Sequence, residues 1–303
     1  MDRLRTFYFV AKLKSFTKAA EALALTQPAV SIQIKSLEQE YGTILFERAG
    51  REIVLTEAGK ILFSHVERIF SELERAESRL REYSDPLRGT VSFGSSILCS
   101  TYLIPPILGK FRQLYPSVRF SLKVRYAEEV LKFIIENEID FGIMGEGNKV
   151  NNEVFEVRQL LEDELVFVMP SSHNIDKNEV TLEEIIDENF IFPEEHSALR
   201  KYLNQKMDEL GVSVKPYIEV GNIEVVKKFV EQNFGCSILS YISVKEEINS
   251  GKLAMRRIKS PFFRRKIILV KKRGRTLPPS AEFFIDFMNK EIEHNKESYE
   301  LRL

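Results

Sequence analysis

The sequence predicts an α/β protein in three parts: a small N-terminal helical domain with a two-stranded hairpin, one long linker helix, and a larger two-lobed α/β domain. Three observations lead to this fold class. Apolar residues recur at helical spacing over the first 42 residues and two short β-rich runs follow. Apolar heptads then continue over residues 62–83. Beyond Thr90, strand-like and helix-like segments alternate, which is the order of an α/β domain.

Composition limits the class of protein. The chain has 303 residues, of which 44% are hydrophobic and 29% charged, so it has room for two or three compact domains. No apolar run approaches the roughly 18 residues that cross a bilayer, and Met1 opens directly into a charged amphipathic helix. We therefore expect no signal peptide, no membrane anchor and a cytoplasmic location.

Cysteine and histidine spacing gives no sign of a metal centre. The two cysteines, Cys99 and Cys236, lie far apart, which suits a reducing compartment better than a disulfide. The four histidines share no ligand spacing; they are His65, His173, His196 and His294. We expect neither a metal nor another cofactor.

The first element is a helix over residues 3–13, and the stretch Ser15–Gly42 adds two more. Ala19, Ala20 and Leu23 give a short helix with one apolar face. Thr26 stands at the N-cap of the next helix, with Pro28 in its first turn, where a missing N–H group costs nothing. The buried stripe of that helix is predicted to comprise Val30, Ile34, Leu37 and Tyr41. These helices form a three-helix core.

The other face of this third helix carries hydrogen-bonding side chains. Gln27, Ser31 and Lys35 recur every four residues, as in a helix-turn-helix that offers a recognition helix to the DNA major groove. Glutamine can pair with adenine, serine with several base edges, and lysine with phosphate or guanine. Residues 1–36 carry six lysines and arginines against two acids, which suits phosphate contact. The alternative is an ordinary helical hairpin.

Two short strands follow, Leu45-Phe46 and Ile53–Leu55, and they predict a wing beside the recognition helix. Arg48 and Arg51 flank the turn at Ala49-Gly50. They are placed to contact phosphates or to enter the minor groove, although such arginines are often only solvated.

Thr56 then caps a long helix with an apolar residue every three or four positions. Its flanks are rich in glutamate and arginine, which indicates a coiled-coil seam and hence dimerisation. The seam is predicted to comprise Leu62, Val66, Ile69, Leu73, Ala76, Leu80 and Tyr83. The alternative, packing onto the chain's own C-terminal body, is weaker because Asp85-Pro86 and Gly89 stop the helix.

Together these motifs resemble the winged helix-turn-helix and linker helix of LysR-type bacterial transcriptional regulators. The resemblance rests on Phe16, Ala19-Ala20, Leu23, Thr26–Ser31, Gln33-Ile34, Leu37-Glu38, Gly42, Leu45-Phe46, Arg48, Arg51, Leu55-Thr56 and Ala58-Gly59. It implies that Gln27, Pro28, Ser31 and Gln33 lie at the DNA surface. The family often has arginine where this chain has Ile32, so a bidentate guanine reader is replaced by an apolar contact to a thymine methyl group.

From Thr90 the pattern predicts two α/β lobes with two crossings between them. Residues 89–163 and 264–303 are expected to form lobe 1, and residues 164–263 lobe 2. This arrangement resembles the periplasmic-binding-protein-like effector domain of the same family. The cleft between such lobes is the default place for a small ligand.

Hydroxyls and helix starts at the ends of strands supply the candidate effector contacts. They suit a carboxylate, sulfate or phosphate, so we expect an anionic metabolite. The resemblance adds that Ser96, Ser197 and Arg200 match family positions that often meet the effector. The alternative for each serine is a helix cap. The candidates are Ser95, Ser96, Cys99, Gly145, Glu146, His196, Ser197, Arg200 and Asn222.

Two leucines stand where the family frequently has threonine. Leu98 and Leu199 remove two hydroxyl groups, so we expect a smaller or less polar pocket. The basic runs Arg264–Lys266 and Lys271–Arg273 could form a second nucleic-acid patch, but charged ends on a buried strand explain them better.

The sequence therefore predicts an effector-controlled regulator that binds double-stranded DNA at a pseudo-palindromic operator as a homodimer or homotetramer, with RNA polymerase as a further candidate partner. No nucleophile–base pair, phosphate loop or paired carboxylates favour an enzyme. Two alternatives stay open: a two-lobed enzyme with a DNA-tethering module, and a DNA-binding protein without effector control.

Overall fold

A computed structural model of the chain describes residues 2–49, 52–82, 86–147, 149–173, 175–259 and 263–299. The chain divides into two compact units, Met1–Arg81 and Glu82–Leu303, and each is described by itself. No helix in these described ranges is both long and apolar enough to cross a membrane.

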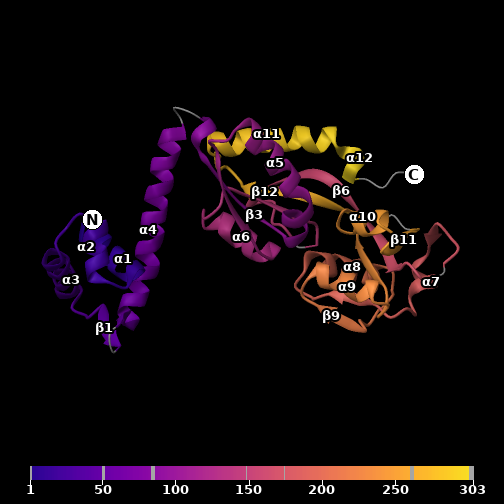
Figure 1. The fold of residues 1–303 in the computed structure, drawn as a ribbon, viewed down its shortest axis with the longest axis horizontal. Helices are drawn as coiled ribbons and strands as arrows, with labels where there is room; N and C mark the ends of the chain where they lie inside the picture. Colours follow the sequence, from indigo (N-terminus) through magenta and orange to yellow (C-terminus); the bar gives the residue numbers. More distant parts are fainter. Residues whose placement is uncertain are drawn as a thin grey trace. The chain divides into compact units, whose positions relative to one another are not determined.

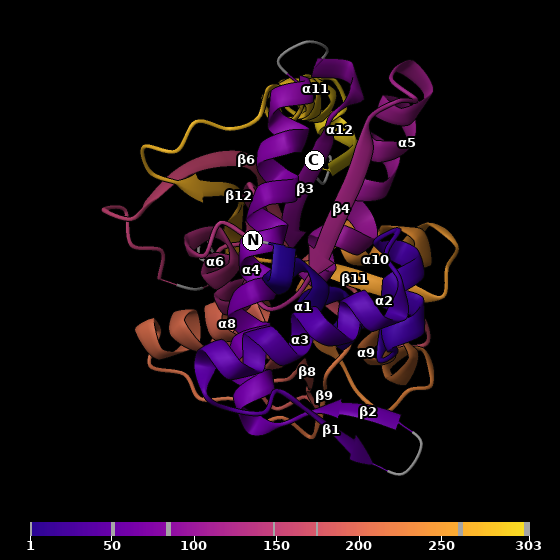
Figure 2. The ribbon, with the colours of Figure 1, turned by 90° about the vertical axis from the view of Figure 1, so that its left-hand side faces the viewer.

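The first unit is a three-helix core with a hairpin and one long helix (Figures 1 and 2). Thr26 is the N-cap of the third helix, as predicted, and its hydroxyl accepts a hydrogen bond from the Ala29 N–H group. Gly42 ends that helix in the left-handed conformation, with a φ of 66°. The elements are α1 (Asp2–Leu13), α2 (Phe16–Ala22), α3 (Gln27–Tyr41), β1 (Phe46–Ala49), β2 (Glu52–Leu55) and α4 (Glu57–Glu82).

The predicted buried stripe of α3 is correct for three of its four members. Val30, Ile34 and Leu37 are buried, but Tyr41 is 49% exposed. Tyr41 is the last residue of the helix, directly before the Gly42 cap, and the helical spacing alone does not show where the core ends.

The apolar seam predicted for α4 divides into two portions. Val66 is 2% exposed and belongs to the core of the first unit, and Leu62 packs against the same core. Further along, Ile69, Leu73 and Leu80 are 46%, 44% and 71% exposed. A single uninterrupted seam from Leu62 is therefore wrong, because the first turns of the helix complete their own domain. Tyr83, the last predicted member, lies outside the described residues.

The second unit contains one eight-stranded mixed sheet, in the order β4-β3-β5-β12-β6-β11-β7, with β10 also paired to β6. A separate parallel pair joins β8 to β9. The elements are η1 (Pro86–Arg88), β3 (Thr90–Ser95), η2 (Cys99–Leu103), α5 (Ile104–Leu114), β4 (Arg119–Val124), α6 (Ala127–Ile135), β5 (Phe141–Gly145), β6 (Phe155–Pro170), β7 (Glu179–Val180), α7 (Leu182–Ile185), β8 (Ile191–Pro193), α8 (Ala198–Glu209), β9 (Ile218–Val220), α9 (Ile223–Glu231), β10 (Ser237–Ser240), α10 (Tyr241–Asn249), β11 (Leu253–Ile258), β12 (Arg264–Lys272), α11 (Pro279–His294) and α12 (Lys296–Tyr299).

Strand β6 belongs to both lobes. Residues 155–164 pair with β12, and residues 165–170 pair with β10 and β11. In the sequence, the apolar run Leu165–Met169 indicates a strand only for the second half. The first half was missed because Phe155 is followed by four exposed residues rather than by alternating apolar ones. Helix α10 and strand β11 were also missed.

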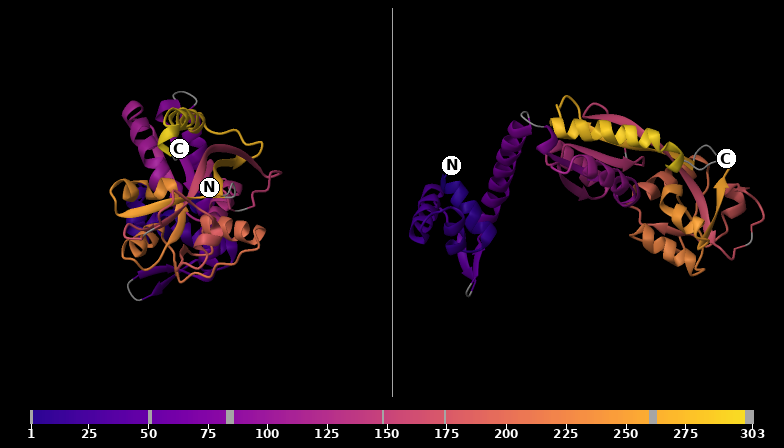
Figure 3. Two further views of the ribbon diagram at one scale, coloured as in Figure 1. Left: turned by 90° about the vertical axis from the view of Figure 1, so that its right-hand side faces the viewer. Right: turned by 45° about the horizontal axis from the view of Figure 1, so that its top comes forward.

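Helices cover both faces of the sheet in lobe 1. α5 and α11 pack on one face around Phe111 and Phe284, and α6 packs on the other around Val130 and Ile134 (Figure 3). Lobe 2 has a core of its own that includes Phe167, Phe190 and Ile238. The ends of β3 and β5 and the starts of α6 and α8 meet between the two lobes.

Candidate functional sites in the recognition helix and the inter-lobe cleft

The exposed side of α3 carries the residues that the sequence singled out for DNA. Gln27 and Pro28 lie in its first turn and Lys35 two turns later, and all three are exposed. The Gln27 amide donates a hydrogen bond of 2.9 Å to the Ser31 hydroxyl, which leaves the amide oxygen facing solvent. Ile32 is 69% exposed, so its apolar side chain is free to contact a thymine methyl group.

Gln33 lies at the edge of this surface. Its amide oxygen accepts a hydrogen bond from the hydroxyl of Thr6, a residue of α1 that is only 2% exposed. Gln33 therefore helps to fix α3 against α1. Arg51 and the Arg48 side chain lie outside the described part of the chain; the hairpin that carries them pairs in antiparallel register, with Phe46 opposite Leu55.

A cavity of about 60 Å³ lies in the cleft between the lobes. Its walls come from the end of β3, the start of α6, the end of β5, the start of α8, the start of α9 and β12. Typical pockets for larger metabolites hold roughly 300–1,000 Å³, so this cavity suits a small ligand. The lining residues are Ser96, Ile97, Leu98, Arg125, Tyr126, Ala127, Gly145, Pro193, Ser197, Ala198, Leu199, Gly221, Ile223 and Arg265.

Positive charge surrounds this cavity. Arg265 is 2% exposed, and its Nε donates a hydrogen bond of 2.9 Å to Asp163, which also accepts one from the Ser240 hydroxyl. The guanidinium carbon and Nη1 of Arg265 lie 3.1 Å from where a Cβ on Gly145 would stand, so glycine at position 145 leaves room for the arginine. Arg125 adds an exposed cation at the edge, where its Nε lies 3.7 Å from a Glu129 oxygen.

Two helices begin at the cavity wall and add their N-terminal dipoles. α8 starts after Ser197, whose hydroxyl accepts a hydrogen bond from the Arg200 N–H group, so Ser197 is both a cap and a lining residue. α6 starts after Tyr126 without a side-chain cap. Free N–H groups at helix starts attract anions.

Ser96 is the lining residue with an unmet hydrogen-bonding need. Its hydroxyl oxygen is buried and makes no hydrogen bond of standard geometry within the described residues, although the Cys99 thiol lies beside it. Its backbone is held, because the Ser96 N–H group donates to the Ile143 carbonyl at 3.1 Å. A buried hydroxyl without a partner is costly, and a ligand in the cavity would supply one.

The cavity brings together Ser96, Gly145 and Ser197 from the predicted effector residues. Among the described residues, the other six do not line it. The Ser95 hydroxyl donates to the Ser96 carbonyl, and Cys99 is fully buried in the core of lobe 1, where burial raises the pKa of its thiol to about 12. The Glu146 carboxylate accepts from the Lys266 N–H group.

His196, Arg200 and Asn222 stay beside the cleft. His196 is exposed, with its ring centroid 6.4 Å from that of Tyr126, and Asn222 caps α9. Arg200 turns into lobe 2, with its guanidinium over the Phe192 ring and its Nε donating to Asn204. Burial lowers the pKa of Arg200, and one of its buried guanidinium nitrogens has no hydrogen-bond partner in the part of the chain described here.

Sequence reasoning missed Arg265 and Tyr126. The run Arg264–Lys266 was explained as charged ends on a buried strand, yet Arg265 is the buried cation of the cleft. The alternation of the strand was the available signal, because neighbours on a strand point to opposite sides and one of two adjacent arginines must face inward. The Arg264 side chain is 52% exposed.

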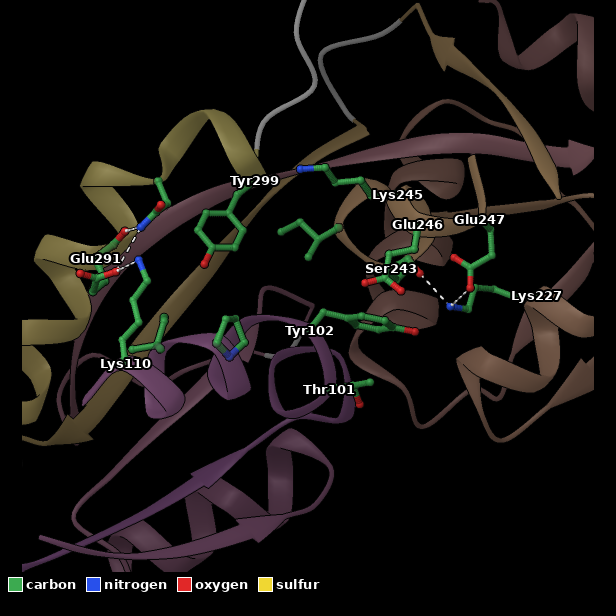
Figure 4. Close-up of a pocket in the computed structure, with 14 residues that line it drawn as sticks. Thr101, Tyr102, Lys110, Lys227, Ser243, Lys245, Glu246, Glu247, Glu291 and Tyr299 are labelled. Carbon is green, nitrogen blue, oxygen red and sulfur yellow. Dashed lines mark hydrogen bonds and ion pairs between the residues drawn. The ribbon is translucent and has the colours of Figure 1, made fainter. Parts of the chain in front are cut away.

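A second, larger cavity of about 460 Å³ is lined by η2, α5, α10, α11 and α12 (Figure 4). Two of its lysines already have carboxylate partners: Lys110 lies 2.6 Å from Glu291, and Lys227 lies 2.7 Å from Glu247. Tyr102 and Tyr299 add aromatic surface. The cations of the cleft are paired as well, Arg265 with Asp163 and Arg125 with Glu129, so the feature that distinguishes the cleft is the buried Ser96 hydroxyl on its wall.

An exposed recognition helix in one unit and a cationic inter-lobe cavity in the other define a DNA-binding regulator with a ligand-sensing domain. Two family models match the chain: "Bacterial regulatory helix-turn-helix protein, lysR family" over residues 1–60 and "LysR substrate binding domain" over residues 84–293. The protein belongs to the LysR family of DNA-binding transcriptional regulators.

Individual relatives agree with this assignment. The chain is 31% identical over 289 residues to the "RuBisCO operon transcriptional regulator" of Allochromatium vinosum, covering 95% of each protein. It is 28% identical to the "HTH-type transcriptional regulator CysL" of Bacillus subtilis (strain 168), covering 88% of this chain and 89% of that protein. The crystal structure of full-length CbnR complexed with its target DNA has the same fold, with a TM-score of 0.71 at 20% identity over 95% of this chain and 98% of that one.

Proposed function

We propose that this regulator senses a small anion bound in the inter-lobe cleft. The observation that carries the proposal is the buried Ser96 hydroxyl without a partner, on the wall of a cavity that also holds the Arg265 guanidinium. Asp163 balances the charge of Arg265, and Glu129 lies 3.7 Å from Arg125, so the helix starts at α6 and α8 supply the remaining attraction.

The size of the cavity narrows the ligand class. At about 60 Å³ it has room for an inorganic oxyanion or a short carboxylate rather than an aromatic acid. Leu98 and Leu199 both line it, in keeping with the smaller, less polar pocket expected from the sequence. Of the two named relatives, only the Allochromatium vinosum protein has a target stated in its name, so the proposal concerns the ligand and not the regulated gene.

Thermal unfolding of the full chain in sulfate, phosphate, acetate and malonate tests the proposal. We expect at least one of these anions to raise the unfolding temperature in a saturable way, because a ligand that binds only the folded state stabilises it. Ser96→Ala should weaken that effect. Ser100→Ala is the matched control, because the Ser100 hydroxyl donates to the Ile97 carbonyl and does not line the cavity. Equal losses in both variants would contradict the proposal.

We further propose that operator bases are read by Gln27, Ser31 and Ile32, while Pro28 and Lys35 contact the backbone. The direct support is exposure: on one side of α3, Gln27, Pro28, Ile32 and Lys35 are exposed and Ser31 is half-buried, whereas Gln33 is held by Thr6. The arginines of the hairpin, Arg48 and Arg51, stay candidates for phosphate contact.

Dimerisation through the second half of α4 is the proposed assembly. Ile69, Leu73 and Leu80 form an exposed apolar stripe that a partner helix would cover. Two recognition helices related by a twofold axis would read a pseudo-palindromic operator. We propose that the protein acts in the cytoplasm, with a homotetramer and contact with RNA polymerase as further levels of assembly.

A further inference from the structure

Three metal-binding side chains meet in lobe 2, away from the cleft. His173 follows β6, Glu188 precedes β8 and Cys236 precedes β10. One ligand atom from each lies within 4.8 Å of the other two. Their sequence spacing gives no hint of this cluster, and no described residue of the cluster lines the cleft cavity.

The backbone holds two of these residues in fixed register. The Cys236 N–H group donates to the Asn189 carbonyl at 2.9 Å, and the Ile191 N–H group donates to the Cys236 carbonyl at 2.8 Å. Gly235 allows this close approach: it has a φ of 157°, and a Cβ there would stand 2.0 Å from the Asn189 oxygen. The site is therefore preorganised on the Glu188 and Cys236 sides.

The third side is fixed by a turn. The His173 N–H group donates to the Pro170 carbonyl at 3.0 Å, directly after β6. The imidazole Nε2 lies 3.2 Å from a Glu188 oxygen, while Nδ1 is buried without a hydrogen-bond partner in the described ranges.

The distances fit a tetrahedral ion. With metal–ligand bonds of about 2.0–2.3 Å, the edges of a tetrahedron are about 3.4 Å between nitrogen and oxygen and about 3.6 Å between sulfur and oxygen. The corresponding separations here are 3.2 Å from His173 to Glu188 and 4.0 Å from the Cys236 sulfur to the second Glu188 oxygen. The three ligand atoms lie within 4.8 Å of one another, so side-chain movements of up to about 1 Å would close the site.

The donor set selects the metal. A thiolate, an imidazole and a carboxylate suit Zn²⁺, whereas Mg²⁺ and Ca²⁺ prefer oxygen ligands. The His173 and Glu188 side chains are 26% and 33% exposed, so water can reach the fourth position, while Cys236 is 1% exposed.

We propose that His173, Glu188 and Cys236 form a zinc-binding site with water as the fourth ligand. Binding releases the Cys236 thiol proton to solvent and forms the zinc–sulfur bond, with no change of oxidation state. The ion ties the turn after β6 to the segments that enter β8 and β10, and so stabilises lobe 2.

Cobalt substitution of the full-length, chelator-treated protein tests this proposal, because Co²⁺ bound to a thiolate absorbs in the near ultraviolet. We expect one equivalent of Co²⁺ to give this band together with the visible bands of a tetrahedral ion, and Zn²⁺ to remove both. Half-saturation by zinc should occur below about 1 µM. Zinc should also raise the unfolding temperature.

Variants assign the signal to the three residues. Cys236→Ala and Cys236→Ser should lose the thiolate band and bind zinc more than about 100-fold more weakly, since loss of a direct ligand exceeds the 10–100-fold typical of supporting residues. Glu188→Gln should weaken binding without removing the band. Cys99→Ala is the matched control, because Cys99 is the other buried free cysteine and should leave the spectrum unchanged. Circular dichroism of each metal-free variant checks folding.

Several results would overturn the proposal. Absence of a thiolate band at one equivalent would reduce the cluster to a His173–Glu188 ion pair beside a thiol. The same conclusion would follow if Cys99→Ala lost the band as fully as Cys236→Ala, or if zinc stabilised the wild type and Cys236→Ser equally.

Discussion

Replacing Arg265 by methionine should destabilise the protein far more than the same change at its neighbour Arg264. Arg265 and Asp163 are 2% and 0% exposed and lie 2.9 Å apart, so the substitution leaves a carboxylate buried without its cation. Breaking such a pair costs about 3–5 kcal/mol. Asp163 keeps its hydrogen bond from the Ser240 hydroxyl, which places the expected loss near the lower end, at about 3 kcal/mol.

Arg264→Met is the matched control on the same strand. Arg264 is half exposed and lies 3.9 Å from Glu162 and 4.0 Å from Glu164, so its ion pairs are screened by water and its loss should cost about 1 kcal/mol or less. Adding Asp163→Asn to Arg265→Met should recover part of the stability, because the unpaired charge is then removed.

Urea unfolding of the full chain followed by circular dichroism measures these differences, since the sequence contains no tryptophan. The N-terminal unit is the same in every variant, so the shift of the effector-domain transition reports the substitution. If Arg265→Met and Arg264→Met shift the transition equally, the buried Arg265–Asp163 pair does not stabilise the effector domain as its geometry indicates.

The remaining predictions concern function and reactivity. Gln27→Ala should weaken operator binding by about 1–3 kcal/mol and relax preference at one base pair; equal losses on random DNA in the same titration would mean that Gln27 touches only backbone. Leu73→Lys should disrupt the dimer by burying unpaired charge in the α4 stripe, and a variant that sediments as the wild type would refute dimerisation there. Ser96→Ala should weaken binding of the anion found by thermal screening about tenfold or more, by calorimetry, while operator binding without that anion survives. Cys99 should resist alkylation at pH 8, because a pKa of about 12 leaves roughly one thiol in 10,000 as thiolate, and labelling should rise with pH. Rapid labelling of the Cys236→Ala protein at pH 8 would contradict this.

Local chemistry explains why the DNA-binding part could be predicted from the sequence. The start of α3 follows from the Thr26 cap and Pro28, and its end from Gly42, all of which act within one turn of the helix. The exposed position of Gln27 then follows from helical geometry. Tyr41 was assigned to the core because spacing gives the direction of a side chain and not the extent of the domain beneath it.

The cleft could be predicted only in part. Ser96 follows a strand directly, so its place at the edge of the sheet is a local property. The burial of Arg265 depends on Asp163, about a hundred residues away, and no local pattern shows that partner. The family resemblance predicts Arg200 in the cleft, but its guanidinium packs over the Phe192 ring in lobe 2.

The shared strand β6 has a mechanical consequence. Because one continuous strand pairs with β12 over its first ten residues and with β10 and β11 over the rest, relative rotation of the lobes must be taken up as torsion along that strand. Asp163, Glu164 and Leu165 stand where the partners change. Changes in twist at this junction would therefore also move the Arg265 guanidinium, which lies on the neighbouring strand, pairs with Asp163 and lines the cleft cavity.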